Sequence, residues 1–212
     1  MDKKERFLDL DILRGLAFLL MIIHHTWFFY NLSTHNYFIN EPEYINIIGK
    51  LSRYTFILLS GFMISVSKSK NWCKRIFRSI RILIHGLVIT YFSLIFIPET
   101  PIYFGILHYI AVSSLLLYFI NPAILILLYL YFKQYPLSIS ILNTSQLDYF
   151  SLLKWLPISI IGMLMGYLYE GSNLFNNQNS VILFFETLSQ NSLELYSLHF
   201  LLFMFISSLF IK

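Results

Sequence analysis

Residues 8–32 form a long apolar run that nevertheless contains ionisable side chains, and this combination constrains the fold more than any other stretch. The run is long enough to cross a bilayer as a helix. A charged side chain inside a membrane helix costs roughly 2.5–3.5 kcal/mol on insertion scales, so such groups usually face a protein interior and carry function. Among these residues are Asp11, Arg14, His24 and His25. We therefore expect one face of this membrane helix to be turned toward other helices.

At about 100° per residue, Asp11, Arg14 and His25 lie on one side of the helix. Asp11 and Arg14 are three residues apart and can pair, whereas His25 lies about three turns, or roughly 16 Å, beyond Arg14. One interpretation makes Asp11–Arg14 a structural pair and His25 an interior histidine with satisfied hydrogen bonds. The alternative makes His25 part of a site, because His24 stands beside it and Asn31 extends the polar stripe.

The composition is that of an integral membrane protein. Of the 212 residues, 57% are hydrophobic and 12% are charged, against about 25% charged in soluble domains. The net charge of +4 does not indicate nucleic acid, because the basic residues lie next to spans. Cys73 is the only cysteine, which excludes an intrachain disulfide and a cysteine-based zinc site. We expect an all-α fold with one domain over residues 1–212, a polytopic membrane bundle of about six to seven transmembrane helices.

The apolar stretches and the polar breaks between them predict the order of the spans. The expected spans are about 8–31, 46–67, 79–97, 102–120, 123–133, 151–169 and 191–211. The segment 123–133 is short for a membrane helix, so it either crosses with a tilt or is re-entrant. If it crosses, the C-terminus lies on the opposite side from the N-terminus; otherwise both lie on one side. Small residues at Ser60-Gly61 and at Gly162 and Gly166 predict close helix packing.

Basic residues predict the orientation. Three precede the first span and six lie in the loop 68–81, whereas the loops 32–45 and 98–101 contain none. The positive-inside rule therefore makes the N-terminus and the loop 68–81 cytoplasmic. The simplest interpretation of the charge run is a solvated loop that sets the topology. The alternative is a binding surface for a phosphate-bearing ligand or for anionic lipid headgroups.

This orientation places several polar residues toward the outer side. His25 lies in the outer half of the first span, and His108 lies near the outer end of the fourth. Asp148 and Trp155 lie at the outer mouth of the sixth, and Arg53 starts from the outer end of its helix. These side chains could line one cavity. His108 could equally be an interior hydrogen-bonded histidine, and Asp148 a helix cap.

Short motif-like elements follow one another along nearly the whole chain. They are Arg14-Gly15-Leu16-Ala17 with Met21 and His25, Ser60-Gly61, Gly105-Ile106-Leu107-His108, Leu147-Asp148-Tyr149-Phe150 with Trp155, and Asn191-Ser192-Leu193-Glu194-Leu195-Tyr196 with His199. In this order they resemble the heparan-alpha-glucosaminide N-acetyltransferase catalytic-domain family of the transmembrane acyltransferase superfamily. The first element is weak alone, and the last three together are fairly specific. Asn31 departs from the family pattern, in which many members have an acid.

The resemblance implies a membrane enzyme that moves an acetyl (acyl) group from a coenzyme A thioester to a sugar or glycan-like acceptor. The implied donor is acetyl-CoA with no metal, and the implied partners are membrane lipids, acyl-CoA and a small-molecule or glycan acceptor. Acyl transfer needs a base and charge stabilisation, which suit His and Arg. We expect catalytic roles for His25, His108 and Asp148, and substrate-binding roles for Arg14, Arg53, Asn31, Trp155 and His199.

Two other function classes fit parts of the sequence. Polar residues and broken helices also suit a transporter or channel, although the chain shows no inverted repeat. Histidines within the spans, among them His25, His85, His108 and His199, could ligate haem or a metal. Their expected depths do not match clearly, which argues against paired axial ligands.

Overall fold

The computed structural model describes residues 7–34, 41–67, 71–98, 100–134, 149–169 and 179–210, and these residues form eight helices. The helices are α1 (Leu8–Ser33), α2 (Glu43–Val66), α3 (Trp72–Phe96), α4 (Ile106–Phe119), α5 (Pro122–Gln134), α6 (Leu152–Tyr167), α7 (Ser180–Gln190) and α8 (Ser192–Phe210). Four of them, α1, α2, α3 and α8, are long and apolar enough to cross a membrane, and α4, α5 and α6 are shorter apolar helices. The expected all-α membrane bundle is confirmed.

The basic run after α2 is largely helical, so α3 begins earlier than the expected span at about 79, and the expected loop was wrong for residues 72–78. The Asn71 side chain accepts a hydrogen bond from the backbone N–H of Cys73 and caps the start of α3. The first turns of α3 then carry Lys74, Arg75, Arg78 and Arg81. Lysine and arginine are good helix formers, and a cluster of their charges does not end a helix as glycine or proline would.

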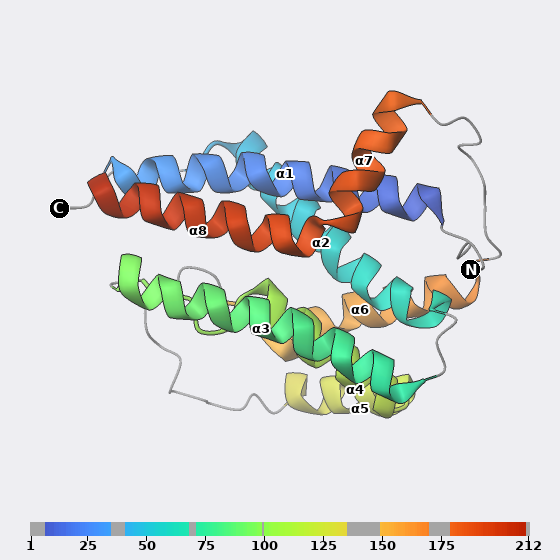
Figure 1. The fold of residues 1–212 in the computed structure, drawn as a ribbon. Coiled ribbons are helices and arrows are strands. Elements are labelled where there is room, and N and C mark those ends of the chain that lie inside the picture. Colours follow the sequence, from blue (N-terminus) through green and yellow to red (C-terminus); the bar gives the residue numbers. More distant parts are fainter. Residues whose placement is uncertain are drawn as a thin grey trace.

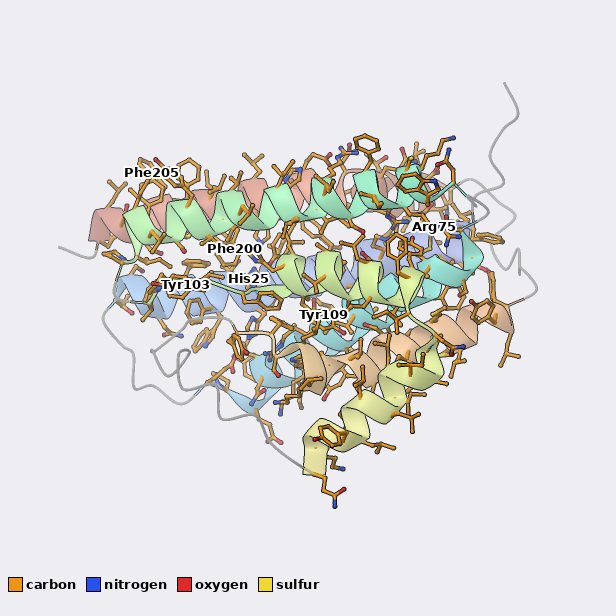
Figure 2. All side chains as sticks on the ribbon, turned by 90° about the horizontal axis from the view of Figure 1, so that it is seen from below. His25, Arg75, Tyr103, Tyr109, Phe200 and Phe205 are labelled. Carbon is orange, nitrogen blue, oxygen red and sulfur yellow. The ribbon has the colours of Figure 1, made fainter. Side chains whose placement is uncertain are left out.

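The helices α1 and α8 lie side by side and run in the same direction (Figure 1). Asp11 of α1 meets Ser189 just before α8, and Ser207 near the end of α8 donates a hydrogen bond to the Phe29 carbonyl. The helix α3 also runs with α8, because Arg81 pairs with Glu194 and Phe96 packs on Phe205. We call the end at which α1 and α3 begin the basic end and the opposite end the far end. Arg75 marks the basic end, and Tyr103 and Phe205 mark the far end (Figure 2).

Glycines bring α2 and α6 into backbone contact. A Cβ atom at Gly61 would lie 1.9 Å from the Ser159 carbonyl oxygen, and one at Gly162 would lie 2.0 Å from the Leu58 carbonyl oxygen. Gly166 also packs against α2. These contacts confirm the close packing that the small residues predict.

The two remaining helices, α5 and α7, change the direction of the chain. The helix α5 follows α4 and packs on α6, where its Leu125 lies in one cluster with Leu156 and Ile160. The helix α7 crosses α1 at an angle and joins α8 at Asn191. Because α8 runs with α1, the described chain finishes at the far end. This agrees with the seven-span alternative, in which the segment 123–133 crosses.

Candidate active site

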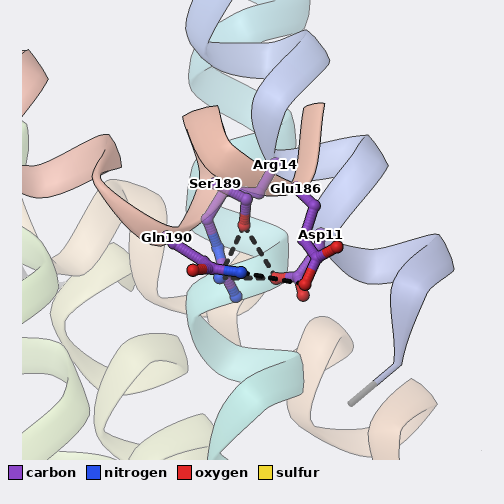
Figure 3. A network of polar contacts seen from close by, with 5 residues as sticks. All are labelled: Asp11, Arg14, Glu186, Ser189 and Gln190. Carbon is purple, nitrogen blue, oxygen red and sulfur yellow. Dashed lines mark hydrogen bonds and ion pairs between the residues drawn. The ribbon is translucent and has the colours of Figure 1, made fainter. Parts of the chain in front are cut away.

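Near the basic end, Arg14 joins α1 to α7. Its Nη1 atom lies 3.3 Å from Asp11 Oδ1 and 3.1 Å from Ser189 Oγ. The Ser189 hydroxyl in turn donates to Asp11 Oδ1 at 2.7 Å, and beside it Gln190 donates to Glu186 at 2.9 Å (Figure 3). The structure therefore brings together the expected Asp11–Arg14 pair and adds Ser189 as its third member. The pair was expected from spacing along one helix, whereas Ser189 comes from a distant part of the chain.

A cavity of about 260 Å³ lies against this network. Three arginines, Arg14, Arg78 and Arg81, line it together with Glu194. Glu194 pairs with Arg81, so the lining keeps an excess of positive charge. The rest of its wall is mainly apolar. Its apolar lining residues are Met21, Phe56, Leu59, Met63, Ile82, Ile106, Leu107, Ile110 and Leu193. The cavity thus combines a cationic part with an apolar surface.

Further along α1, His25 lies inside the bundle beside Phe200 (Figure 2). Its Nδ1 atom lies 3.0 Å from Nε2 of His199, and the two rings are nearly parallel, 13° apart. The sequence predicts that His25 lies on an inward, polar face of the first span. It places His199 in the last span and does not predict a contact between the two histidines. Their contact arises because α1 and α8 run side by side, so residues of similar depth meet.

A second, smaller cavity of about 30 Å³ lies next to His25. His24 and Arg53 line it, as does Gly49, against which the His24 ring packs so closely that a Cβ atom would lie 2.2 Å from its Cδ2. His24 Nε2 also lies 3.0 Å from Glu41 Oε1, before the start of α2. The structure therefore places Arg53 near His25, as the sequence predicts. His24 lines the same cavity, and Glu41 pairs with His24.

The two cavities share part of their wall. Met21, Ile106 and Tyr196 line both the arginine-lined cavity and the smaller cavity at His25. The two cavities therefore adjoin each other at these three residues. A thioether side chain such as that of Met21 is flexible and adapts readily.

His108 lies elsewhere, between α3 and α4. Its ring packs against Gly86, and its Nε2 atom lies 3.4 Å from Thr90 Oγ1. It lines a separate small cavity, so the structure does not show the expected single cavity with His25. The physical reason is the rotation of α4, which turns His108 toward α3. Its buried Nδ1 atom has no hydrogen-bond partner among the described residues.

The remaining expected site residues are Trp155, Asn31 and Asp148, and they differ in how they relate to the cavity at His25. Trp155 packs on Phe150, which lines the cavity at His25, and edge-on against Tyr54. Asn31 donates to the carbonyl of Trp27 in its own helix, so part of its amide is used locally. Asp148 lies outside the described residues.

Sequence reasoning missed the specific roles of Arg78, Arg81 and Tyr196 in the cavity walls. The available signal was the three-residue spacing of Arg78 and Arg81, which places both on one face of a helix once that segment is taken as helical. Within the described ranges, no group of three or more His, Cys, Asp or Glu side chains is arranged to hold a metal ion.

Comparison with known proteins gives one finding. The family model described as heparan-alpha-glucosaminide N-acetyltransferase, catalytic, matches residues 6–201, nearly the whole chain. No curated protein and no solved structure matches the chain significantly.

Proposed function

The chain belongs to the heparan-alpha-glucosaminide N-acetyltransferase catalytic family of membrane acetyltransferases, and we propose that it transfers an acetyl group from acetyl-CoA to a sugar or glycan-like acceptor. The observation that carries this proposal is the wall shared by the arginine-lined cavity and the cavity at His25. Such a wall would let the donor's anionic part and its reacting carbon occupy neighbouring spaces.

The arginine-lined cavity is the proposed donor site. Coenzyme A carries phosphates, and guanidinium groups bind phosphate oxygens in pairs. Arg14, Arg78 and Arg81 supply those groups, while the apolar wall suits the narrow pantetheine arm. Because basic residues cluster at this end, we infer that the N-terminus and residues 68–81 face the cytoplasm, where the coenzyme would arrive.

The acceptor would approach His25 from the far end. His24, Glu41 and Arg53 provide donors and acceptors for sugar hydroxyl groups on that side. His25 would take the proton of the acceptor hydroxyl or amine as that group attacks the thioester carbonyl. Arg53 is the cation placed to stabilise the resulting oxyanion. Collapse of the tetrahedral intermediate would break the carbon–sulfur bond, and His25 would return the proton to the departing thiolate.

The direct test uses purified protein in lipid nanodiscs with radiolabelled acetyl-CoA and a panel of amino sugars, neutral sugars and glycans. We expect label to move to an acceptor, with release of coenzyme A that depends on that acceptor. Transfer of label to no acceptor, together with sugar flux in protein-containing liposomes, would contradict the proposal and favour a transporter.

The role of His25 is tested by His25→Ala in the same assay. We expect activity to fall on the order of a hundredfold or more, as for loss of a general base, with thermal stability unchanged. The matched control is His85→Ala, because His85 is also a membrane histidine hydrogen-bonded to α8, through Ser197, but lines neither cavity. If His25→Ala stays active and His108→Ala does not, the base is His108.

A further inference from the structure

The hydrogen bonds around His199 have a fixed direction. The His199 Nδ1 atom lies 3.0 Å from the carbonyl oxygen of Leu195, one turn earlier in α8. A carbonyl can only accept, so Nδ1 of His199 carries the proton. A neutral imidazole has one N–H, and Nε2 of His199 is therefore an acceptor.

This direction determines the proton position on His25. Its Nδ1 atom faces the acceptor nitrogen of His199 at 3.0 Å, so Nδ1 of His25 must donate. The neutral His25 ring then has its lone pair on Nε2. The tautomer of a histidine is set in this way by the hydrogen bond of its other nitrogen.

From this chain of hydrogen bonds we propose that His199 is a positioning residue that holds His25 in its Nδ1–H tautomer, leaving Nε2 as the base. The inference deepens the proposed function and rests on it only for the identity of the reaction. An isolated neutral histidine side chain prefers the opposite tautomer, with the proton on Nε2. Without His199, the nitrogen that meets the acceptor would therefore usually be protonated and unable to act as a base.

Aromatic side chains hold the two rings in this arrangement. Phe200 lies edge-on to His25, with ring centroids 5.0 Å apart, and Phe18 lies edge-on to His199 at 5.6 Å. Phe18 and Phe200 are each 2% exposed, so both aromatic side chains that contact the imidazoles are buried. These edge-on contacts favour the observed ring orientations, in which Nδ1 of His25 is directed at His199.

The substitutions that test this inference are His199→Gln and His199→Leu. Glutamine keeps an acceptor oxygen near the position of Nε2, whereas leucine keeps the volume and removes the acceptor. Protein labelled with nitrogen-15 in histidine reports each tautomer by NMR in detergent micelles, and loss of signals in His25→Gln identifies those of His25. We expect the Nδ1–H form in the unchanged protein and in His199→Gln, and a shift to Nε2–H in His199→Leu.

Kinetics give the second readout. We expect His199→Leu to lower kcat at least tenfold with the KM for acetyl-CoA unchanged, and His199→Gln to keep most of the kcat. The control Phe203→Leu changes a neighbour of the His199 ring and should leave the tautomer unchanged. A general packing defect would instead affect Phe203→Leu and both His199 variants alike.

The outcomes separate this inference from the proposed function. A His25 ring with its proton on Nε2 in the unchanged protein overturns the inference, whether or not any acceptor is turned over. If His199→Leu does not accumulate, the spectra of the unchanged protein and His199→Gln still decide in the same way. A change of tautomer in His199→Leu without a change in kcat also overturns the positioning role. Absence of acetyl transfer in the unchanged protein counts against the proposed function alone.

Discussion

At the scale of single residues, Arg14 takes part both in a polar network and in the wall of a cavity. It neutralises Asp11 and accompanies Ser189 of α7, and it also lines the cavity proposed for the donor. Both partners of the ion pair are largely shielded, with side chains 20% and 15% exposed. Substitution of Arg14 alone therefore changes both the stability and the electrostatics of the cavity, and these effects need to be separated.

A double variant separates them. We expect Arg14→Ala to destabilise the protein by about 3–5 kcal/mol, since it leaves the Asp11 carboxylate buried without its cation. Asp11→Asn in the same background should restore much of the stability, because a neutral amide needs no counter-charge. Thermal unfolding in detergent and the monodisperse yield measure this effect. The restored double variant should still show a raised KM for acetyl-CoA, and a stable, fully active Arg14→Ala would contradict both roles.

At the scale of helices, the contact between α2 and α6 leaves least room for change. The nearest atoms to Gly61 and Gly162 are carbonyl oxygens, which cannot move away as a side chain can. Close approach of this kind is a main source of helix association in membranes, where there is no hydrophobic driving force between helices.

The substitution Gly162→Ala tests the close contact between α2 and α6. Its added methyl group would lie about 2 Å from the Leu58 carbonyl oxygen, so the two helices must separate, and we expect a loss of about 1–3 kcal/mol as for other overpacked cores. The control is Ile161→Ala at the preceding position of α6, because Ile161 is 52% exposed and lies about 100° around the helix from Gly162. Equal thermal stability of the two variants would show that the contact is not tight.

At the scale of the whole molecule, the parallel course of α1 and α8 determines where the described chain finishes. Cys73 lies at the start of α3 at the basic end, and Phe210 ends α8 at the far end. With the basic end in the cytoplasm, residues 73 and 210 should react with thiol reagents from opposite sides of the membrane.

Labelling of intact cells measures this orientation. We expect Cys73 to be protected from an impermeant maleimide, and Cys73→Ser/Phe210→Cys to be labelled from outside. Cell lysis provides the positive control for Cys73. Labelling of Cys73 from outside would reverse the orientation, and labelling of both positions from one side would contradict the parallel course of α3 and α8.

The parts that could be predicted from the sequence depend on local periodicity. The helical repeat is fixed, so the inward face shared by Arg14 and His25 and the packing role of Gly162 could be read directly. The contact between His25 and His199 could not, because it depends on where α8 begins relative to α1. That depth is set by α7 and its attachment through Ser189, a contact between residues that are far apart in sequence. The rotation of His108 toward α3 likewise depends on packing that no single segment encodes.

The backbone contact between α2 and α6 also has a mechanical consequence. Helices whose main chains touch cannot be spread by changes of side-chain rotamer, so α2 and α6 must move as one rigid body. The arginine-lined cavity, at about 260 Å³, is small compared with ligand pockets of roughly 300–1,000 Å³. Its other walls are formed by α1, α3, α4, α7 and α8, so its enlargement requires displacement of one of these helices. Because His199 lies on α8 and His25 on α1, displacement of α8 away from α1 would strain the hydrogen bond that aligns His25, and return of α8 would restore it.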